Sequence, residues 1–250
     1  MSWRVALIDS CGEWPGAVEA AAFVDEDAGV RRCAAAAADA TGHGSRVARL
    51  LSGGGAELEL MLGQVLFGKA PTSAAAVAAA LDWAIAGGAD LIHMSLGLAA
   101  DRAVLADAVG RAVGSGCVVV ASVPARGGVV YPAAYPGVIR GTGDARCGPG
   151  ELSCLGPGFF GGCARWAVSG AQNGAVGVDV GAGAGAGAGG GVSAGVGVGA
   201  GASVGAAWVT RGILSEPTRG SAGEVLDRVT AKAIYWGPER RGLVSAMRGE

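Results

Sequence analysis

Charged residues are scarce in this chain. Asp, Glu, Lys and Arg make up 16% of the 250 residues, and the formal net charge is −2. This balance gives no electrostatic reason to expect nucleic acid or an anionic membrane as a partner. Apolar residues make up 51% of the chain, which is enough for a substantial core. We therefore expect one large domain over residues 1–250.

The sequence also lacks a secretory signal. The first residues, "MSWRVALIDSCG", show no basic region followed by an apolar stretch and a cleavage site. The first expected strand begins near Trp3, and no pro-segment precedes it. We therefore expect a cytoplasmic protein.

No C-x-x-C motif occurs among the six cysteines. In a chain without a secretory signal, such cysteines are expected to be reduced thiols. Cys147, Cys154 and Cys163 are candidate metal ligands. They lie seven and nine positions apart with no histidine nearby, which argues against a metal site. We therefore predict no metal and no cofactor. The six cysteines are Cys11, Cys33, Cys117, Cys147, Cys154 and Cys163.

Leucine-rich apolar runs of membrane-spanning length are missing too. Val180–Thr210 carries no charge, but it consists mostly of Gly, Ala and Val and has no Leu, Ile or Phe. Glycine destabilises a helix by about 1 kcal/mol per residue relative to alanine, so a spanning helix is not expected. The low-complexity segment at about 181–200 includes "GAGAGAGAGGG", Gly181–Gly191. It is either a flexible surface insertion or a source of unusual backbone angles near a site.

Short runs rich in Val, Ile and Leu alternate with longer helical patterns. The short runs barely alternate in polarity, which is typical of strands buried on both faces. This order predicts an α/β domain with a mostly parallel central sheet flanked by helices. The expected strands are Arg4–Ile8, Glu59–Leu66, Asp90–Met94, Cys117–Ala121 and Val138–Gly141. The expected helices are Ser45–Leu51, Ser73–Ala86, Arg102–Val113, Ser203–Leu214 and Gly223–Ala233.

Ser203 lies in a G-x-S-x-G pattern, "GASVG", Gly201–Gly205. In α/β-hydrolases the catalytic histidine follows this serine in the chain. Both histidines of this sequence, His43 and His93, precede Ser203, which excludes that architecture if Ser203 is the nucleophile. The order that remains is acid, histidine and serine, with Asp9 closing the first expected strand.

Asp9, His43 and Ser203 are expected at the same edge of the sheet. A carboxylate at the carboxyl end of a parallel strand faces the crevice where α/β proteins bind ligands. His43, in "DATGHGSRVARLL", and Ser203 each open an expected helix. A serine nucleophile needs a base, and the base needs a carboxylate that holds its tautomer. Backbone N–H groups at a helix start also stabilise a developing oxyanion.

Alternatives without this chemistry stay open. Asp9 is also a plausible turn former and His43 a plausible loop residue. Ser193, in "GVSAG", competes with Ser203, but no helical run such as "AAWVTRGIL" follows it. His93 lies in an apolar strand and is expected to be a buried histidine with satisfied hydrogen bonds.

Six segments, in order, resemble the subtilisin-like serine proteases, and together they span most of Trp3–Leu214. "VALIDS" resembles the aspartate strand, "GHGSRVARLL" the H-G-T-x-V-A segment, and "DLIHMSLG" the strand ending in N-M-S-L-G. "CVVVASVPARGGVVYPAAYPGVI" resembles the oxyanion loop and the Y-P-x-x-Y-P segment. "VDVGAG" resembles D-V-x-A-P-G, and "GASVGAAWVTRGIL" resembles the serine helix.

The resemblance implies a subtilisin-like fold and peptide-bond hydrolysis through an acyl-enzyme. Asp9 would orient His43, His43 would act as base and then acid, and Ser203 would attack. The edge formed by Ser95, Leu96 and Gly97 would pair with an extended peptide substrate.

Several positions depart from the family pattern. The oxyanion asparagine is replaced by Ala125, which has no side-chain donor, and losing such a donor costs about 10²–10³ in kcat. The Ser203 backbone N–H remains in the oxyanion region, and Arg126 is a weak candidate for a substitute charge. The serine helix has Ala207 and Trp208 where the family has proline and histidine, and Ala202 replaces the threonine before the serine. No clear calcium loop is present.

Within this family, the short start and "YPGVIRGTGDARC" most resemble the processing proteases of quinohemoprotein amine dehydrogenase maturation. The resemblance implies removal of a leader peptide from the crosslinked γ subunit, presented by its radical SAM modifying enzyme. Two other functions stay open: a pseudoprotease that serves as a peptide-binding scaffold, and a peptide ligase or cyclase that uses the same triad.

Overall fold

The computed structural model describes residues 2–34, 38–55, 57–68, 70–166, 200–216 and 219–239. The strands in these ranges are β1 (Trp3–Asp9), β2 (Ala17–Glu26), β3 (Gly29–Cys33), β4 (Leu58–Gln64), β5 (Leu91–Met94), β6 (Val118–Ser122), β7 (Val138–Asp144), β8 (Leu152–Gly156), β9 (Phe159–Cys163) and β10 (Ala233–Trp236). The helices are α1 (His43–Ser52), α2 (Ala74–Ala86), α3 (Ala103–Gly114), α4 (Ala200–Leu214) and α5 (Ala222–Ala231).

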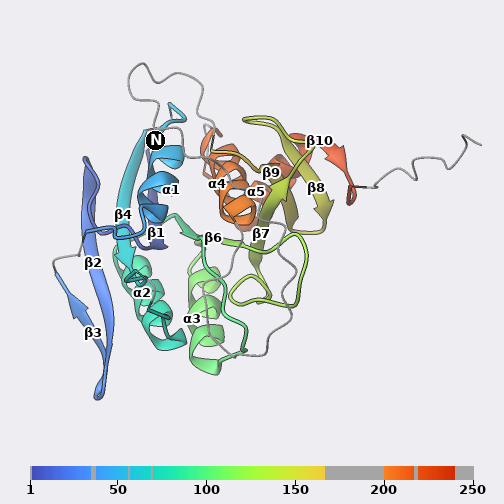
Figure 1. The fold of residues 1–250 in the computed structure, drawn as a ribbon. Coiled ribbons are helices and arrows are strands. Elements are labelled where there is room, and N and C mark those ends of the chain that lie inside the picture. Colours follow the sequence, from blue (N-terminus) through green and yellow to red (C-terminus); the bar gives the residue numbers. More distant parts are fainter. Residues whose placement is uncertain are drawn as a thin grey trace, which may run out of the picture.

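All the strands belong to one sheet, in the order β10-β8-β9-β7-β6-β5-β1-β4-β2-β3 (Figure 1). Neighbouring strands run parallel except in the pairs β2/β3 and β8/β9. The prediction of an α/β domain with a mostly parallel sheet is confirmed.

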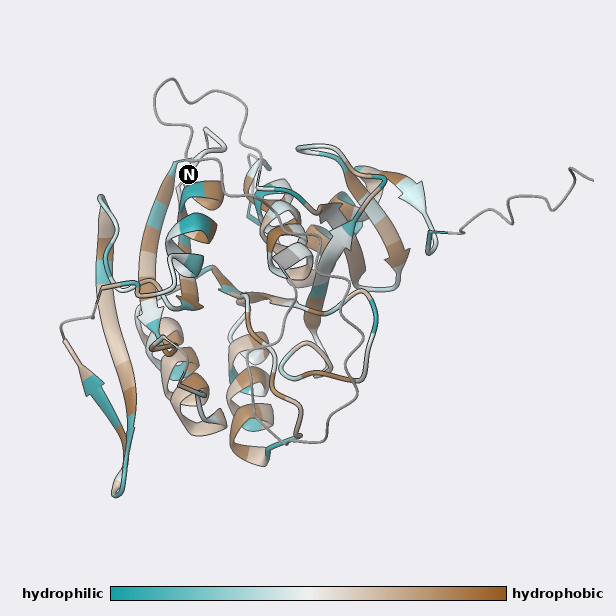
Figure 2. Cartoon of the chain, in the orientation of Figure 1, coloured by the Kyte–Doolittle hydropathy of each residue, from teal (hydrophilic) through white to brown (hydrophobic). Residues whose placement is uncertain are grey.

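Helices cover both faces of the sheet and form two cores. Ala6 and Ile8 of β1 pack with α2 and α3, whereas Val5 and Leu7 pack with α1, α4 and α5. Successive side chains of a strand point to opposite faces, so a strand buried on both sides is apolar throughout. Figure 2 shows the apolar residues gathered in the sheet and on α2 and α3, and hydrophilic residues at the tip of the β2–β3 hairpin.

Each of the expected strands and helices is present, with ends that differ by no more than three residues. One boundary is wrong, because the helix expected over Gly223–Ala233 ends at Ala231 and Ala233 begins β10. No helix in the described ranges combines the length and the apolar character that a membrane crossing requires. The segment Gly181–Gly191, the "VDVGAG" block and Ser193 lie outside the described residues.

Two hairpins and β10 were not expected from the sequence. No strand was expected between Val138–Gly141 and the low-complexity segment, but β8 and β9 form a hairpin there. β2 is rich in alanine, which has low strand propensity. It forms nevertheless because it pairs with β4 and because Phe23 packs on Trp83 of α2, with ring centroids 5.8 Å apart.

The helix that carries Ser203 lies directly against the backbone of β7. A Cβ atom on Gly205 would lie 2.0 Å from the carbonyl oxygen of Thr142, and one on Gly141 would lie 2.5 Å from the Cα of Ala206. Only glycine permits so close an approach. The contact places the first turn of α4, which holds Ser203, beside the carboxyl end of β7.

Gly205→Ala is therefore expected to lower the free energy of unfolding by about 1–3 kcal/mol or more, because the methyl group meets backbone atoms that cannot move aside. The matched control is Gly110→Ala in α3, where an added Cβ has nothing within 4 Å. That change is expected to stabilise the helix by about 0.5–1 kcal/mol. Urea denaturation measures both, and equal effects of the two substitutions would contradict this account of α4 packing.

Candidate active site

Asp9 and His43 meet at the carboxyl edge of the sheet. Asp9 is the last residue of β1 and is fully buried, and His43 is the first residue of α1. Oδ1 of Asp9 lies 2.8 Å from Nδ1 of His43. A carboxylate at this distance holds the ring proton on Nδ1, which leaves Nε2 free to accept a proton. The His43 side chain is 25% exposed, so part of it is accessible from outside the protein.

The environment raises the pKa of His43 above its ordinary value of 6.5. Burial favours the neutral ring, but the charge of Asp9 and its hydrogen bond favour the protonated ring and prevail. Asp39 acts in the same direction as Asp9, and Arg46 acts against it. The neutral form of His43, which is the form that can accept a proton, therefore dominates only above this raised pKa.

Glycines on both sides of His43 allow the chain to pass close to β1. Gly42 caps α1 with a left-handed φ of 65°, which favours glycine. A Cβ atom on Gly44 would lie 2.4 Å from the backbone N of Cys11. This packing brings the first turn of α1 against the residues that follow Asp9.

Asp39, which the sequence analysis did not single out, holds the start of α1. Its carboxylate accepts hydrogen bonds from the backbone N–H groups of Gly42 at 2.9 Å and Ser45 at 2.8 Å, and from the Ser45 hydroxyl at 2.7 Å. Burial opposes ionisation, but the hydrogen bonds from Ser45 outweigh it and hold the pKa of Asp39 below its ordinary value. A carboxylate shortly before a helix start is a capping signal that could have identified Asp39.

Ser10 ties the end of β1 to the start of α1. Its hydroxyl oxygen accepts hydrogen bonds from the Gly44 backbone N–H at 2.9 Å and from the Thr41 hydroxyl at 3.0 Å. Its carbonyl oxygen accepts one from Nε2 of Gln64 at 2.8 Å. These contacts fix the helix that carries His43 relative to the strand that carries Asp9.

Ser203 lies in the first turn of α4 and is 1% exposed. Its hydroxyl has no hydrogen-bond partner among the described residues, so it does not bond to His43 in this structure. α4 packs against α1, which places the two helices side by side. The Asp9–His43 contact is thus formed, whereas the bond between base and nucleophile that acyl transfer requires is not. Such bonds often tighten only when substrate binds.

His93 is buried and structural, as expected from its apolar strand. Its Nδ1 lies 2.8 Å from the hydroxyl of Thr210 on α4, and its Nε2 lies 2.7 Å from the hydroxyl of Ser95. Burial lowers its pKa to about 4, so the ring is neutral near pH 7. The Thr210 contact also links α4 to β5 across the sheet face.

The expected substrate edge offers its backbone rather than its side chains. The Ser95 hydroxyl is engaged by His93, and both Ser95 and Leu96 are buried. Gly97 is partly exposed, and the next residue, Leu98, pairs with Tyr131 through two backbone hydrogen bonds of 2.7 and 2.9 Å. A substrate at 95–97 would therefore bind through main-chain hydrogen bonds.

Ala125 and Arg126 follow β6 at the same edge and are exposed. They line a cavity of about 300 Å³ together with Thr142, Gly143 and Asp144 of β7. Because Gly143 also contacts the first turn of α4, this cavity lies next to the helix start that carries Ser203. Ala125 has no side-chain hydrogen-bond donor to offer to it.

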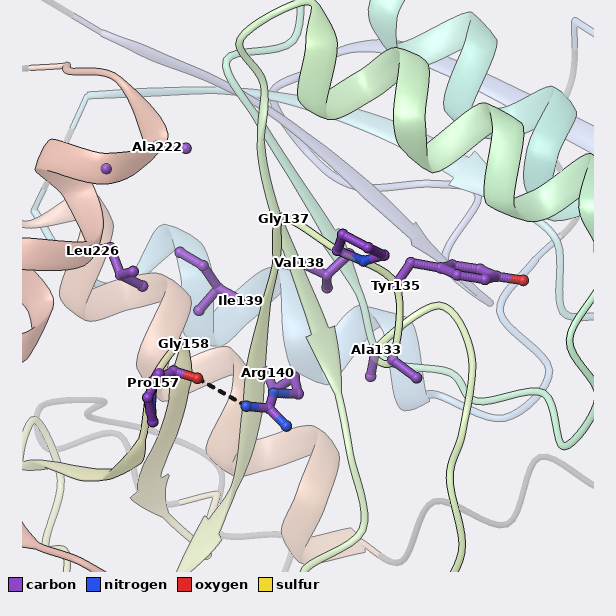
Figure 3. A pocket seen from close by; sticks show the side chains of 13 residues that line it. Ala133, Tyr135, Gly137, Val138, Ile139, Arg140, Pro157, Gly158, Ala222 and Leu226 are labelled. Carbon is purple, nitrogen blue, oxygen red and sulfur yellow. Dashed lines mark hydrogen bonds between the residues drawn. The ribbon is translucent and has the colours of Figure 1, made fainter.

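A cavity of about 430 Å³ lies at the opposite edge of the sheet, between the start of β7 and α5 (Figure 3). Val138, Ile139 and Leu226 give it an apolar lining. Arg140 also lines it, but its Nη2 donates a 2.8 Å hydrogen bond to the carbonyl of Pro157. None of the candidate catalytic residues lies in this cavity.

No group of three His, Cys, Asp or Glu side chains suited to a metal ion occurs in the described part of the chain. The three C-terminal cysteines do not gather into such a group. All six cysteines are free thiols, and burial raises the pKa of Cys147 to about 11, which keeps it protonated and unreactive.

Comparison with known proteins gives distant likenesses only. No family model matches the chain, and no curated protein matches it. Among solved structures it is similar to one titled "S41 Psychrophilic Protease", with a TM-score of 0.47 and 20% identity over 64% of this chain and 56% of that one. It is also similar to "Sphericase", with a TM-score of 0.46 and 22% identity over 57% of this chain and 56% of that one. The chain thus spans little more than half the length of either protein, and likenesses at this level do not assign a family.

The Asp9–His43 contact predicts the titration of His43. Its midpoint is expected above 6.5, and Asp9→Asn is expected to lower it because the amide no longer favours the protonated ring. The contact stabilises the fold fully below pH 6.5, and this contribution is lost as the pH rises through the raised pKa. NMR can follow His43 separately because the chain has only two histidines.

His93 is the internal control, since its signals are expected to stay constant until the pH approaches about 4. A His43 midpoint at or below 6.5, or one unchanged by Asp9→Asn, would contradict the geometry of the pair.

Proposed function

We propose that the chain is a subtilisin-like serine endopeptidase in which Asp9, His43 and Ser203 act together. The observation that carries this proposal is the 2.8 Å contact between the buried Asp9 carboxylate and His43, at the edge of the sheet where the Ser203 helix begins. A buried acid next to a partly exposed imidazole with a shifted pKa is typical of a functional site.

The chemistry follows from these positions. His43 Nε2 takes the proton of the Ser203 hydroxyl while Oγ attacks the carbonyl carbon of the peptide bond. The backbone N–H of Ser203, at the start of α4, donates to the resulting oxyanion. The C–N bond then breaks, His43 returns the proton to the departing amine, and water hydrolyses the acyl-enzyme by the same steps.

Ala125 indicates a slow enzyme. In this family the asparagine at that position donates a second hydrogen bond to the oxyanion, and its loss costs about 10²–10³ in kcat. Low turnover is sufficient for an enzyme that cuts one bond in each molecule of a presented substrate.

The substrate we propose is a leader peptide. An extended chain would pair with the backbone at 95–97, and one of its side chains would enter the cavity beside Ala125. The resemblance of "YPGVIRGTGDARC" supports a specific case: leader removal from the crosslinked γ subunit of quinohemoprotein amine dehydrogenase. The radical SAM modifying enzyme would present the subunit, and the reaction would take place in the cytoplasm.

A pseudoprotease is the second candidate. Two observations favour it: the Ser203 hydroxyl is buried without a hydrogen bond in the described structure, and Ala125 removes a donor. Such a protein would bind the peptide at the same edge without cutting it. A ligase or cyclase would use the same three residues but transfer the acyl group to an amine.

Incubation with the crosslinked subunit and its modifying enzyme tests the proposal, with product masses read by mass spectrometry. We expect two products whose summed mass exceeds that of the substrate by one water, and no products with Ser203→Ala or His43→Ala. Products that together lack this added water would identify a ligase or cyclase. An uncut substrate that binds the protein tightly would identify the scaffold.

The same assay tests the oxyanion region. Ala125→Asn is expected to raise kcat, by up to about 10²–10³, because it restores a donor. Arg126→Asn, the adjacent exposed residue, is the matched control and is not expected to raise it. A gain with both variants, or with neither, would contradict the role assigned to position 125.

A further inference from the structure

A tryptophan that no motif identifies lies against the candidate base. Trp166 follows β9, and its ring centroid is 6.1 Å from that of His43, with the two ring planes at 88°. Edge-to-face packing at this distance is a favourable geometry for aromatic rings. Because β9 runs parallel to β7, Trp166 emerges at the same edge of the sheet as Asp9.

Trp166 is itself held from two sides. The carbonyl oxygen of Arg165, the preceding residue, accepts a 3.2 Å hydrogen bond from Nε1 of Trp208, which is buried in α4. The Arg46 guanidinium lies 5.4 Å from the centroid of the Trp166 ring, and its Nε donates a 3.1 Å hydrogen bond to the carbonyl of Gly42. The indole therefore spans the first turn of α1 and contacts His43 and Arg46 together.

The His43 ring needs this second constraint. Within the described residues, its ring has one hydrogen bond, from Nδ1 to Asp9. One such bond fixes Nδ1 but lets the ring plane turn about it, which would move Nε2 away from the nucleophile. An indole set at right angles to the imidazole restricts that rotation.

We propose that Trp166 is a positioning residue for His43, and that Trp208 holds it in place from the helix that carries Ser203. This inference rests on the proposed function. It gives a role to Trp208, one of the departures from the family pattern in the serine helix. A series of contacts then links the base to the helix of the nucleophile. Trp208 of α4 holds the backbone of Arg165, which positions the adjacent Trp166, and Trp166 orients His43.

Four variants test the proposal. Trp166→Leu keeps an apolar side chain but removes the ring, Trp166→Phe keeps an aromatic ring, and Trp208→Phe removes the Nε1 donor. Trp236→Leu is the matched control, because Trp236 on β10 is 63% exposed. Two measurements apply to each variant: the NMR signals of the His43 ring protons with their contacts to Trp166, and the rate of inactivation by a fluorophosphonate. The thermal midpoint reports folding.

Trp166→Leu is expected to shift the His43 ring signals by removing the ring current, and to slow inactivation about tenfold or more, since small misplacements of a catalytic group are costly. Trp166→Phe is expected to restore most of the rate. Trp208→Phe is expected to weaken the contacts between Trp166 and His43. Trp236→Leu is expected to match the wild type in all measurements.

Unchanged His43 signals in Trp166→Leu would overturn the inference whatever the rates are. So would a loss of rate that is equal in Trp166→Leu and Trp166→Phe, or one that follows the thermal midpoint. If the wild type does not react with the fluorophosphonate, the proposed function fails, while the NMR signals still decide whether Trp166 orients His43.

Discussion

Direct backbone contact between α4 and β7 is the constraint on which the site depends. Glycines at 141 and 205 let helix and strand approach until a Cβ on either would overlap its neighbour. A second contact, from Thr210 to the buried His93, fixes α4 relative to β5. These two contacts fix α4 against the sheet. Ser203 therefore has a defined position at the edge of the sheet, because it lies on a packed helix and not on a loop.

The Asp9 carboxylate is costly to bury, and the structure offsets part of that cost with hydrogen bonds to Oδ1, whereas Oδ2 is buried without a partner among the described residues. Its Oδ1 accepts from the backbone N–H of Ser10 at 2.6 Å and contacts His43 at 2.8 Å. A buried charge is tolerated only with such partners. Asp39 and Ser10 then hold the start of α1, so the imidazole has a defined place beside Asp9 even though it is partly exposed. The same arrangement raises the pKa of His43.

The sequence was sufficient to predict what depends on local pattern and chain order. Apolar runs located the parallel strands, and the ends of a strand and the start of a helix located Asp9 and His43. The sequence was insufficient where contacts with distant segments determine the local structure. β2, for example, is a strand because it pairs with β4 and packs on Trp83, not because of its alanines. Trp166 is 123 positions from His43 (166 − 43), and no pattern connects them. The hydrogen bond between His93 and Thr210 could not be predicted either, because it joins β5 to α4 across 117 positions of the chain.

Labelling with a fluorophosphonate, followed by intact mass and peptide mapping, tests the central claim most directly. It asks whether Ser203 is activated by His43, and it needs no knowledge of the substrate. The account predicts a single adduct on Ser203 that is absent from Ser203→Ala and His43→Ala, either for the protein alone or once the modifying enzyme and its subunit are added. No adduct in either condition, or an adduct on Ser193 instead, would contradict it.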